Sequence, residues 1–340
     1  MKKVVGFGEI MLRMSPPGYL KLIQSDTLQT NYTGAEANVC VSLSRFGLDT
    51  EFVTKLPAND VSQCAVATLK KYGVGTGHIT YGGDRLGCYF LEKGASQRPS
   101  KVTYDRKYSA VSMAERSDFN WDQIFEDAQA FHFSGITAAL GNSLPDVCMD
   151  ACRTAKQRGV KVFCDLNYRK TLWTPEQARE TMGSLVEFVD VLIGNEEDAE
   201  KVLGIRPKSS DVIGGRLNQS DYEDVARQIF EKFGCETIAF TLRTSLSASD
   251  NKWAGILYDK GKAYHSKEYM MHIVDRVGGG DSFSAGLIYG VVNGFEPQKT
   301  LDFAVAASCL KHAIEFDFNL STIKDVENLL NGDGSGRVQR

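Results

Sequence analysis

Residues 276–286 read RVGGGDSFSAG, so that three consecutive glycines stand directly before Asp281. Glycine loses more conformational freedom on folding than any other residue, and a triple glycine outside a linker therefore indicates a specific backbone requirement. The residues that follow, up to Gly294, are apolar at helical spacing, which predicts a helix beginning near Asp281. Because the first N–H groups of a helix are unpaired and lie at its positive end, glycines there favour an anion-binding site.

Asp281 itself has two interpretations. It is a favoured residue type for an ordinary helix N-cap. It can also be a general base held beside the anion site formed by the amides of Gly278, Gly279 and Gly280. A cap alone needs at most one glycine, so the triple glycine favours the general base.

The rest of the chain alternates short apolar runs with amphipathic segments, which predicts an α/β fold with a doubly wound, mostly parallel central sheet flanked by helices. The expected strands are 2–8, 50–56, 130–136, 160–167, 189–195 and 236–242, followed by a hairpin over 253–266. The expected helices are 36–47, 62–73, 144–159, 175–189 and 221–234. Residues 11–33 and 84–111 break this rhythm and predict a small β-sheet lid, whereas the Gly-rich end, 331–340, predicts a disordered tail.

Composition limits the possible partners. The 340 residues carry a net charge of −4, which argues against an extended nucleic-acid or anionic-membrane surface. No apolar run approaches the roughly 18 residues that cross a bilayer, so a cytoplasmic protein is expected, with its eight cysteines as buried, reduced thiols. The GFGE of residues 6–9 lacks the third glycine of a dinucleotide-binding fingerprint, and a Walker A loop is absent from the sequence.

Three further segments place polar residues at expected strand ends or helix starts. Asn195 and Asp198 follow a buried strand; this acidic helix start either complements the helix dipole in a first turn or holds hydrated Mg²⁺, which keeps several waters. Asn167 and Arg169 follow another strand at the edge where open α/β sheets bind ligands. Gly34, with Asn38 one turn later, indicates close backbone approach to a polyhydroxylated ligand, or simply a capped helix.

Taken together, these segments resemble the ribokinase-like (PfkB) carbohydrate kinases. The resemblance covers about residues 2–330 and rests on GAEANV (34–39), NEEDAEKVLGI (195–205) and DRVGGGDSFSAG (275–286). Within the family, the segments 89–110, 165–169 and 315–326 look most like those of 2-keto-3-deoxygluconate kinases. One kinase domain over 1–330 is therefore expected, with the lid formed by the two stretches named above.

The resemblance implies phosphoryl transfer from ATP to a hydroxyl of a sugar acid. Asp281 would be the base and the amides of Gly278, Gly279 and Gly280 the anion hole. The implied substrate-binding residues are Gly34, Asn38, Tyr89, Tyr104, Arg106, Arg169, Asp281 and Asp317. The implied ATP-binding residues are Asn167, Arg169, Asn195, Thr241, Arg243, Ser245, Gly278 and Gly280. Mg²⁺ would be held through water by Asn195 and Asp198, and K⁺ at a monovalent-cation loop containing Asp275.

Alternatives remain open at this stage. Arg106 and Arg169 can neutralise a carboxylate, which favours an acid substrate over the neutral sugars of fructokinases and ribokinases, although Arg169 can equally contact ATP phosphates. Residues 241–253 carry Ser and Thr where the family has a Gly-rich nucleotide loop. A non-catalytic sugar- or nucleotide-sensing module on the same fold is the alternative of another class. Sticky sheet edges in the lid predict a homo-oligomer.

Overall fold

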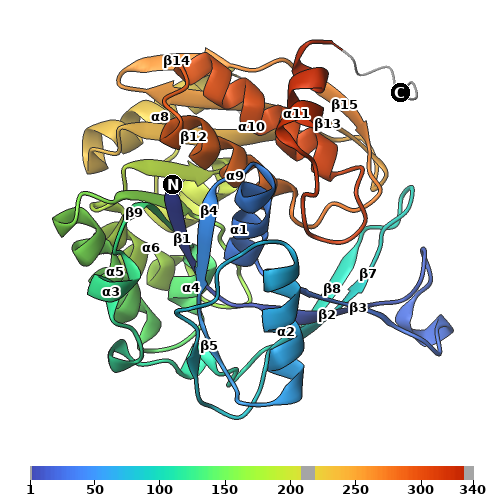
Figure 1. Cartoon of the computed structure of the whole chain (residues 1–340). Helices are drawn as coiled ribbons and strands as arrows, with labels where there is room; N and C mark the ends of the chain where they lie inside the picture. Colours follow the sequence, from blue (N-terminus) through green and yellow to red (C-terminus); the bar gives the residue numbers. More distant parts are fainter. Residues whose placement is uncertain (1, 208–218, 333–340) are drawn as a thin grey trace.

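A computed structural model describes residues 2–207 and 219–332, and in this part of the chain a large sheet forms the centre of the molecule (Figure 1). Its strands are β1 (Lys3–Phe7), β4 (Asp49–Val53), β9 (Ala128–Ser134), β10 (Lys161–Asp165), β11 (Val191–Gly194), β12 (Thr237–Ser245), β13 (Asp250–Asp259), β14 (Lys262–His265) and β15 (Tyr269–His272). All six predicted strands and the predicted hairpin are therefore confirmed.

The pairing of these strands is parallel from β4 through β1, β9, β10 and β11 to β12, and antiparallel from β12 to β13 and on to β14 and β15. The chain first adds β4 on one side of β1 and later adds β9 on the other side. Such a reversal opens a crevice at the carboxyl ends of the strands, which is where ligands bind in open α/β sheets. The predicted doubly wound, mostly parallel sheet is confirmed.

Helices cover both faces of this sheet. They are α1 (Ala35–Arg45), α2 (Asp60–Lys71), α3 (Trp121–Ile124), α4 (Gly135–Ala139), α5 (Leu144–Gln157), α6 (Pro175–Val186), α7 (Glu196–Asp198), α8 (Gln219–Phe233), α9 (Gly279–Val292), α10 (Pro297–Lys311) and α11 (Ile323–Leu330). Short turns of other helix types occur at η1 (Leu22–Gln24), η2 (Val111–Met113), η3 (Arg116–Asp118) and η4 (Ala199–Leu203). The five predicted helices correspond to α1, α2, α5, α6 and α8.

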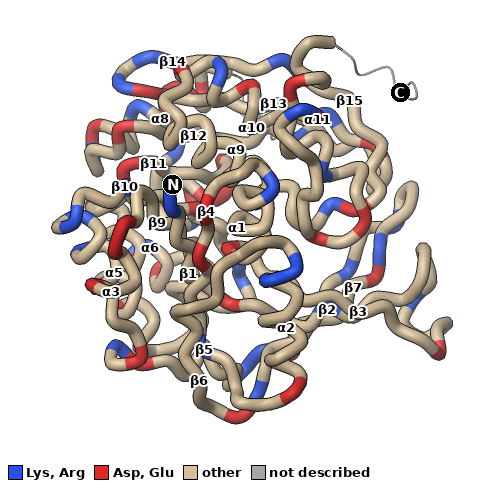
Figure 2. The backbone as a smooth tube through the Cα atoms, in the orientation of Figure 1, with Lys and Arg blue, Asp and Glu red and all other residues tan. Residues whose placement is uncertain are grey.

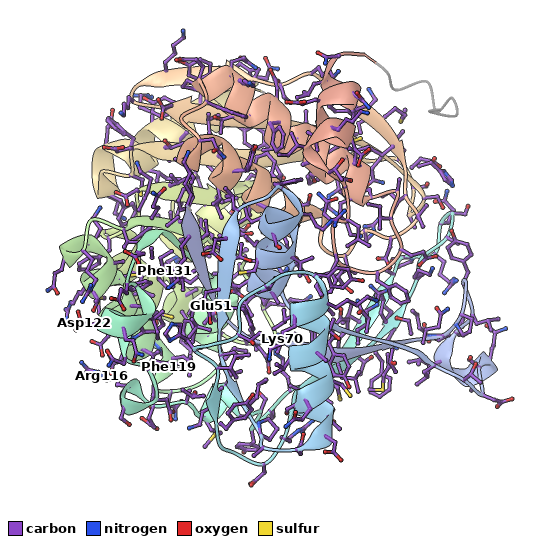
Figure 3. All side chains as sticks on the ribbon, in the orientation of Figure 1. Glu51, Lys70, Arg116, Phe119, Asp122 and Phe131 are labelled. Carbon is purple, nitrogen blue, oxygen red and sulfur yellow. The ribbon has the colours of Figure 1, made fainter. Side chains whose placement is uncertain are left out.

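The core consists of two main apolar clusters, one on each face of the sheet. One cluster joins the sheet to α3, α5, α6 and α8, and the other joins it to α1, α9, α10 and α11. In Figure 3, Phe119 and Phe131 of the first cluster lie inside the molecule, whereas Arg116 and Asp122 lie at its outer edge. The apolar stripes that predicted the helices are thus the surfaces that bury the sheet.

A small second sheet projects from one side of the molecule (Figure 1). Its order is β3 (Gln29–Thr33), β2 (Met11–Ser15), β7 (Cys88–Glu92) and β8 (Lys101–Asp105), so both stretches predicted to form a small sheet contribute strands. A separate pair is formed by β5 (Lys55–Leu56) and β6 (Thr80–Tyr81). Hereafter "the small sheet" means β3, β2, β7 and β8.

Three other expectations concern the surface and the chain end. All eight cysteines are free thiols and five are buried, but Cys64 is exposed, contrary to prediction, because it lies on the outward face of α2. No helix among residues 2–207 and 219–332 is long and apolar enough to cross a bilayer. Basic and acidic residues are interspersed over the elements visible in Figure 2. The predicted disordered tail lies outside the described residues from 333 onward.

Candidate active site

A cavity of about 410 Å³ lies at the carboxyl ends of β10 and β11, between the large sheet and the small sheet. Most of the predicted site residues line it, namely Gly34, Asn38, Tyr89, Tyr104, Arg106, Asn167, Arg169, Asn195, Asp198, Thr241, Arg243, Gly278, Gly280, Asp281 and Asp317. Gly279, Ser245 and Asp275 are not among the lining residues. Segments from the whole length of the chain therefore meet at one site.

Asp281 does not cap its helix. The N-cap of α9 is Gly278, in a left-handed conformation with φ of 84°, and the helix begins at Gly279, two residues before the predicted start. The Asp281 side chain instead accepts a 2.6 Å hydrogen bond at Oδ2 from Nδ2 of Asn38. Burial raises the pKa of Asp281 to about 7, although the bond from Asn38 acts in the opposite direction. The carboxyl group is thus poised to exchange a proton near neutral pH.

The three glycines have different structural requirements. A Cβ at Gly278 would lie 2.0 Å from the carbonyl oxygen of Asp317, and one at Gly279 would lie 2.4 Å from Cε1 of His312. A Cβ at Gly280 would meet no atom within 4 Å. The amide of Gly279 donates to the carbonyl of Arg276. Packing therefore explains two of the glycines, and the hypothesis of an anion hole rests on Gly278 and Gly280, which line the cavity.

Gly34 is also required by a close approach. It is the N-cap of α1, and a Cβ there would lie 1.8 Å from the carbonyl oxygen of Glu9. Two residues further on, the buried Glu36 accepts hydrogen bonds at Oε1 from Ser134 (2.5 Å) and Thr137 (2.6 Å). Burial raises the pKa of Glu36. Sequence analysis missed this residue, although GAEANV places an acid in an otherwise apolar helix.

Carboxyl groups gather on the side of the cavity formed by β10 and β11. Burial raises the pKa of Asp165 well above its usual value, and the charges of Asp198 and Asp281 raise it further. Burial raises the pKa of Asp198 to about 6, while hydrogen bonds to this group and the nearby Arg169 oppose the shift. A cation in this part of the cavity would stabilise the ionised form of all three groups.

Asn195 and Asp198 form a reciprocal capping box at the start of α7, which the sequence analysis did not predict. The Asp198 amide donates to Oδ1 of Asn195 at 2.9 Å, the Asn195 amide donates to Oδ2 of Asp198 at 3.2 Å, and Oδ1 of Asp198 accepts from the amide of Tyr168 at 2.9 Å. Within the described ranges, no three acidic, histidine or cysteine side chains form a metal site by themselves. The oxygen donors fit hydrated Mg²⁺, which keeps several waters and takes few protein ligands.

The small sheet contributes Arg106, which is paired with an acid that sequence analysis did not single out. Nε of Arg106 donates to Oε2 of Glu9 at 2.8 Å, and Nη2 forms a second, shorter bond to the same oxygen. Oε1 of Glu9 accepts from Oγ of Ser109 at 2.6 Å. The guanidinium also lies over the ring of Tyr104, 5.2 Å from its centroid. Glu9 therefore fixes the orientation of Arg106 at the cavity wall.

Tyr89 and Asp317 meet at the base of the small sheet, around a second arginine that was not predicted. Arg13 lies between two carboxylates, with Nη1 2.8 Å from Oδ1 of Asp317 and Nη2 2.6 Å from Oδ2 of Asp275. The hydroxyl of Tyr89 donates to Oδ2 of Asp317 at 2.9 Å. All these groups are buried. Buried and partly exposed residues alternate along β2, and Arg13 lies on the buried side, although the residue types MLRMS give no sequence signal of this.

The opposite wall carries the residues predicted to bind ATP. Asn167 has a left-handed backbone with φ of 38° and follows β10, while Thr241 and Arg243 lie on β12. Burial, with Arg276 and Arg169 nearby, lowers the pKa of Arg243. Ser245 lies beyond Phe240, where the pairing of β12 with β11 ends, and it borders a separate hollow with Ser96 and Arg276.

Comparison with protein families gives a match over residues 1–312 to the pfkB family of carbohydrate kinases. A curated relative, the 2-dehydro-3-deoxygalactonokinase of Haloferax volcanii, is 31% identical over 335 residues, covering 98% of this chain and 98% of its own.

Solved structures give similar matches. A 2-dehydro-3-deoxygluconokinase of Thermotoga maritima superposes with a TM-score of 0.94 at 50% identity, covering 98% of this chain and 100% of its own. A putative 2-keto-3-deoxygluconate kinase of Enterococcus faecalis gives a TM-score of 0.92 at 29% identity, covering 100% and 99%.

Proposed function

The chain belongs to the pfkB family of carbohydrate kinases, and from this premise we propose that it transfers the γ-phosphoryl group of ATP to the 6-hydroxyl of 2-keto-3-deoxygluconate. The product is the 6-phosphate. The observation that carries this proposal is the position of Asp281, a carboxyl group with a pKa of about 7 at the start of α9, in one cavity with Arg106 and Arg169. The similarity to kinases of 2-keto-3-deoxy sugar acids supports the choice of substrate.

An acid substrate is favoured by the arginines. Arg106 uses Nε and Nη2 for Glu9, and its Nη1 donates no hydrogen bond to any described residue. Arg169 lines the cavity, and its Nη1 donates only to the carbonyl of its neighbour Tyr168 among the described residues. Both guanidinium groups can therefore accept an anionic partner, a sugar carboxylate at Arg106 and either a carboxylate or a phosphate at Arg169.

In the proposed reaction, Asp281 removes the proton from the attacking hydroxyl as the phosphoryl group transfers. The amides of Gly278 and Gly280, at the positive end of α9, stabilise the charge on the transferred group. Kinases of this family use ATP with Mg²⁺, which neutralises phosphate charge when bound, and Asn195 and Asp198 would hold its waters. Arg169 and Arg243 would hold the phosphates from the opposite wall.

The deciding experiment measures ADP formation with a panel of 2-keto-3-deoxygluconate, 2-keto-3-deoxygalactonate, fructose and ribose. We expect the highest kcat/KM for 2-keto-3-deoxygluconate, and a neutral sugar that outperforms both acids would refute the proposed substrate class. Asp281→Asn should lower kcat by roughly 10²–10⁴-fold, the usual contribution of a general base, while the affinity for the sugar acid changes only a few-fold.

The galactonate epimer is the second candidate substrate because the Haloferax volcanii relative is named for it. The same panel compares the two epimers directly. A protein that binds the sugar acid and ATP without forming ADP would instead be a sensing module, the alternative of another class.

We also propose that the protein associates through the small sheet. β8 is an edge strand and is exposed over its whole length, and Tyr108 beyond it is 73% exposed. Ile23, in η1 between β2 and β3, is 93% exposed. Exposed sheet edges and apolar side chains favour pairing with a second copy. Light scattering of the wild type and of Ile23→Asp tests this association.

The free thiols suit the cytoplasm, where ATP is available.

A further inference from the structure

The segment that leads into the glycines, Asp275–Gly278, packs against the end of α10 through a buried lysine. Lys311 is the last residue of α10 and has no exposed surface. Its Nζ donates to the carbonyl oxygen of Asp275 at 3.0 Å and to that of Ile314 at 3.3 Å. Burial lowers the pKa of the Lys311 ammonium, while the charges of Asp275 and Asp317 act in the opposite direction.

Lys311 completes a neutral cluster of four buried groups, which we call the charge cluster: Arg13, Asp275, Lys311 and Asp317. None is more than 3% exposed. Oδ2 of Asp275 bonds to Arg13, and Oδ1 accepts from the amide of Val277 at 3.1 Å. The two cations and the two carboxylates balance one another, so the charge cluster carries no uncompensated negative charge.

A monovalent cation at Asp275, which the family resemblance led us to expect, does not fit this arrangement. Such an ion needs several oxygen ligands and a compensating negative charge. The carbonyl oxygen of Asp275 already accepts from Lys311, and both of its carboxylate oxygens are engaged. Adding a cation would bring a third positive charge to two carboxylates in a buried site, which is unfavourable.

We propose that the ammonium of Lys311 takes the place of a monovalent cation, so that this chain works as a kinase without K⁺. The inference rests on the proposed function. Lys311 is a positioning residue: it ties the Asp275 carbonyl to the end of α10, where the carbonyl of His312 also accepts from the amides of Val274 and Asp275. Together these bonds fix the backbone that leads into Gly278, and hence the placement of Asp281.

The first test uses the wild-type protein. Turnover of 2-keto-3-deoxygluconate with Mg²⁺ and ATP is measured at equal ionic strength in KCl, NaCl and tetramethylammonium chloride. The tetramethylammonium ion is too large for a buried site. We expect turnover within two-fold in all three salts. The midpoint of thermal unfolding with Mg²⁺ and ATP should likewise not depend on which cation is present. Activation by K⁺ of five-fold or more, or a thermal stabilisation specific to K⁺, would overturn the inference.

A pair of substitutions provides the second test. Lys311→Ala leaves space where the ammonium was, so it should lose at least ten-fold in kcat in tetramethylammonium chloride and recover in part with increasing K⁺ or NH₄⁺. Lys311→Met fills most of that space and should not recover. Lys70→Met, on the exposed side of α2 (Figure 3), is the matched control and should behave as the wild type in every salt.

The outcomes separate this inference from the proposed function. If no sugar acid is phosphorylated in any salt, the proposed function fails, while the binding of Mg²⁺ and ATP, measured by calorimetry in KCl and in tetramethylammonium chloride, still tests the inference. Equal affinities support it, and an affinity at least five-fold higher in KCl contradicts it. If Lys311→Ala proves unstable, the wild-type salt series alone decides.

Discussion

The side-chain amide of Asn38, one turn into α1, donates to Oδ2 of Asp281, 243 residues further along the chain, at 2.6 Å. The bond stabilises the ionised carboxylate, and Oδ1 of Asn38 is held in turn by the hydroxyl of Thr33 at 2.6 Å. The amide therefore opposes the rise in the Asp281 pKa that burial causes, and so bears on the pH range of the proposed base.

Replacing Asn38 by alanine should therefore shift the pH dependence of turnover. A hydrogen bond to a charged group contributes about 1.5–3 kcal/mol, so its loss should raise the pKa of Asp281 by roughly 1–2 units. The acid limb of the kcat/KM profile, near pH 7 in the wild type, should move upward by that amount. Asn59→Ala, which removes the N-cap of α2 away from the cavity, is the control and should leave the profile unshifted. An unmoved limb in Asn38→Ala would contradict the role given to Asp281.

Gly280→Ala and Gly278→Ala form a matched pair. A Cβ at position 280 has open space, so this variant should fold with unchanged or slightly raised stability, since alanine favours a helix by up to about 1 kcal/mol over glycine. The new methyl group would crowd the anion site, and we expect kcat/KM for ATP to fall about ten-fold or more. Residue 278 has a positive φ, and the Cβ of an alanine there would collide with the Asp317 carbonyl, so Gly278→Ala should lower the midpoint of thermal unfolding. Full activity in Gly280→Ala would exclude the anion hole.

The stability of the protein should depend on pH through Asp281. Its folded pKa of about 7 lies above its ordinary value of 3.8, so between these values the folded state retains a proton that the unfolded state has lost. Stability from this group is present below pH 3.8 and falls as pH rises to about 7, by roughly 1.4 kcal/mol per pH unit. The free energy of unfolding of Asp281→Asn, measured with urea between pH 4 and 7, should fall less steeply with pH than that of the wild type, by that amount.

Asp325→Asn is the control for that series. Thr322 donates to the Asp325 carboxylate in the capping box of α11, and these hydrogen bonds lower the pKa of the group. Its contribution to stability is therefore lost only as pH falls below about 4. If the free energy of unfolding changes with pH equally in the wild type and in Asp281→Asn between pH 4 and 7, Asp281 is not protonated in the folded protein over this range.

Arg106→Leu should lower kcat/KM for the acid substrate far more than for a neutral analogue. The loss of a charge-assisted hydrogen bond corresponds to about 1.5–3 kcal/mol, or roughly 10- to 150-fold in kcat/KM. The single variant also leaves Glu9 buried without its partner, which destabilises the fold. The double variant Glu9→Gln, Arg106→Leu removes both charges and isolates the effect on the substrate. Equal losses for acid and neutral substrates would contradict the carboxylate contact.

The sequence predicts the central sheet well because its strands are continuous apolar runs whose partners need not be known. It also places Asn195, Asp198 and Arg169 at one edge, since parallel strands end together. The pairs formed by Arg106 with Glu9 and by Arg13 with Asp275 and Asp317 were missed, because 97, 262 and 304 residues separate the partners. No local pattern encodes such pairs.

The sequence gives only one of two reasons for the glycines. An anion hole was inferred from all three, and the structure adds that Gly278 and Gly279 are also required by the close approach of the Asp317 carbonyl and the His312 ring, which come from a distant segment. That Ser245 lies outside the lining of the cavity could not be predicted either, since β12 extends to this residue through its pairing with β13.

Arg13 has a consequence for motion. The small sheet lies over the cavity, and Arg13, in the middle of its strand β2, forms ion pairs with Asp275 and Asp317. Moving β2 away would leave the buried carboxylates of Asp275 and Asp317 without their partner, at a cost of about 3–5 kcal/mol. The base of the small sheet therefore stays in place while substrate enters and leaves. Because Tyr89 holds β7 to Asp317 as well, any opening must take place in the edge strands β3 and β8, and the moving part is smaller than the sheet itself.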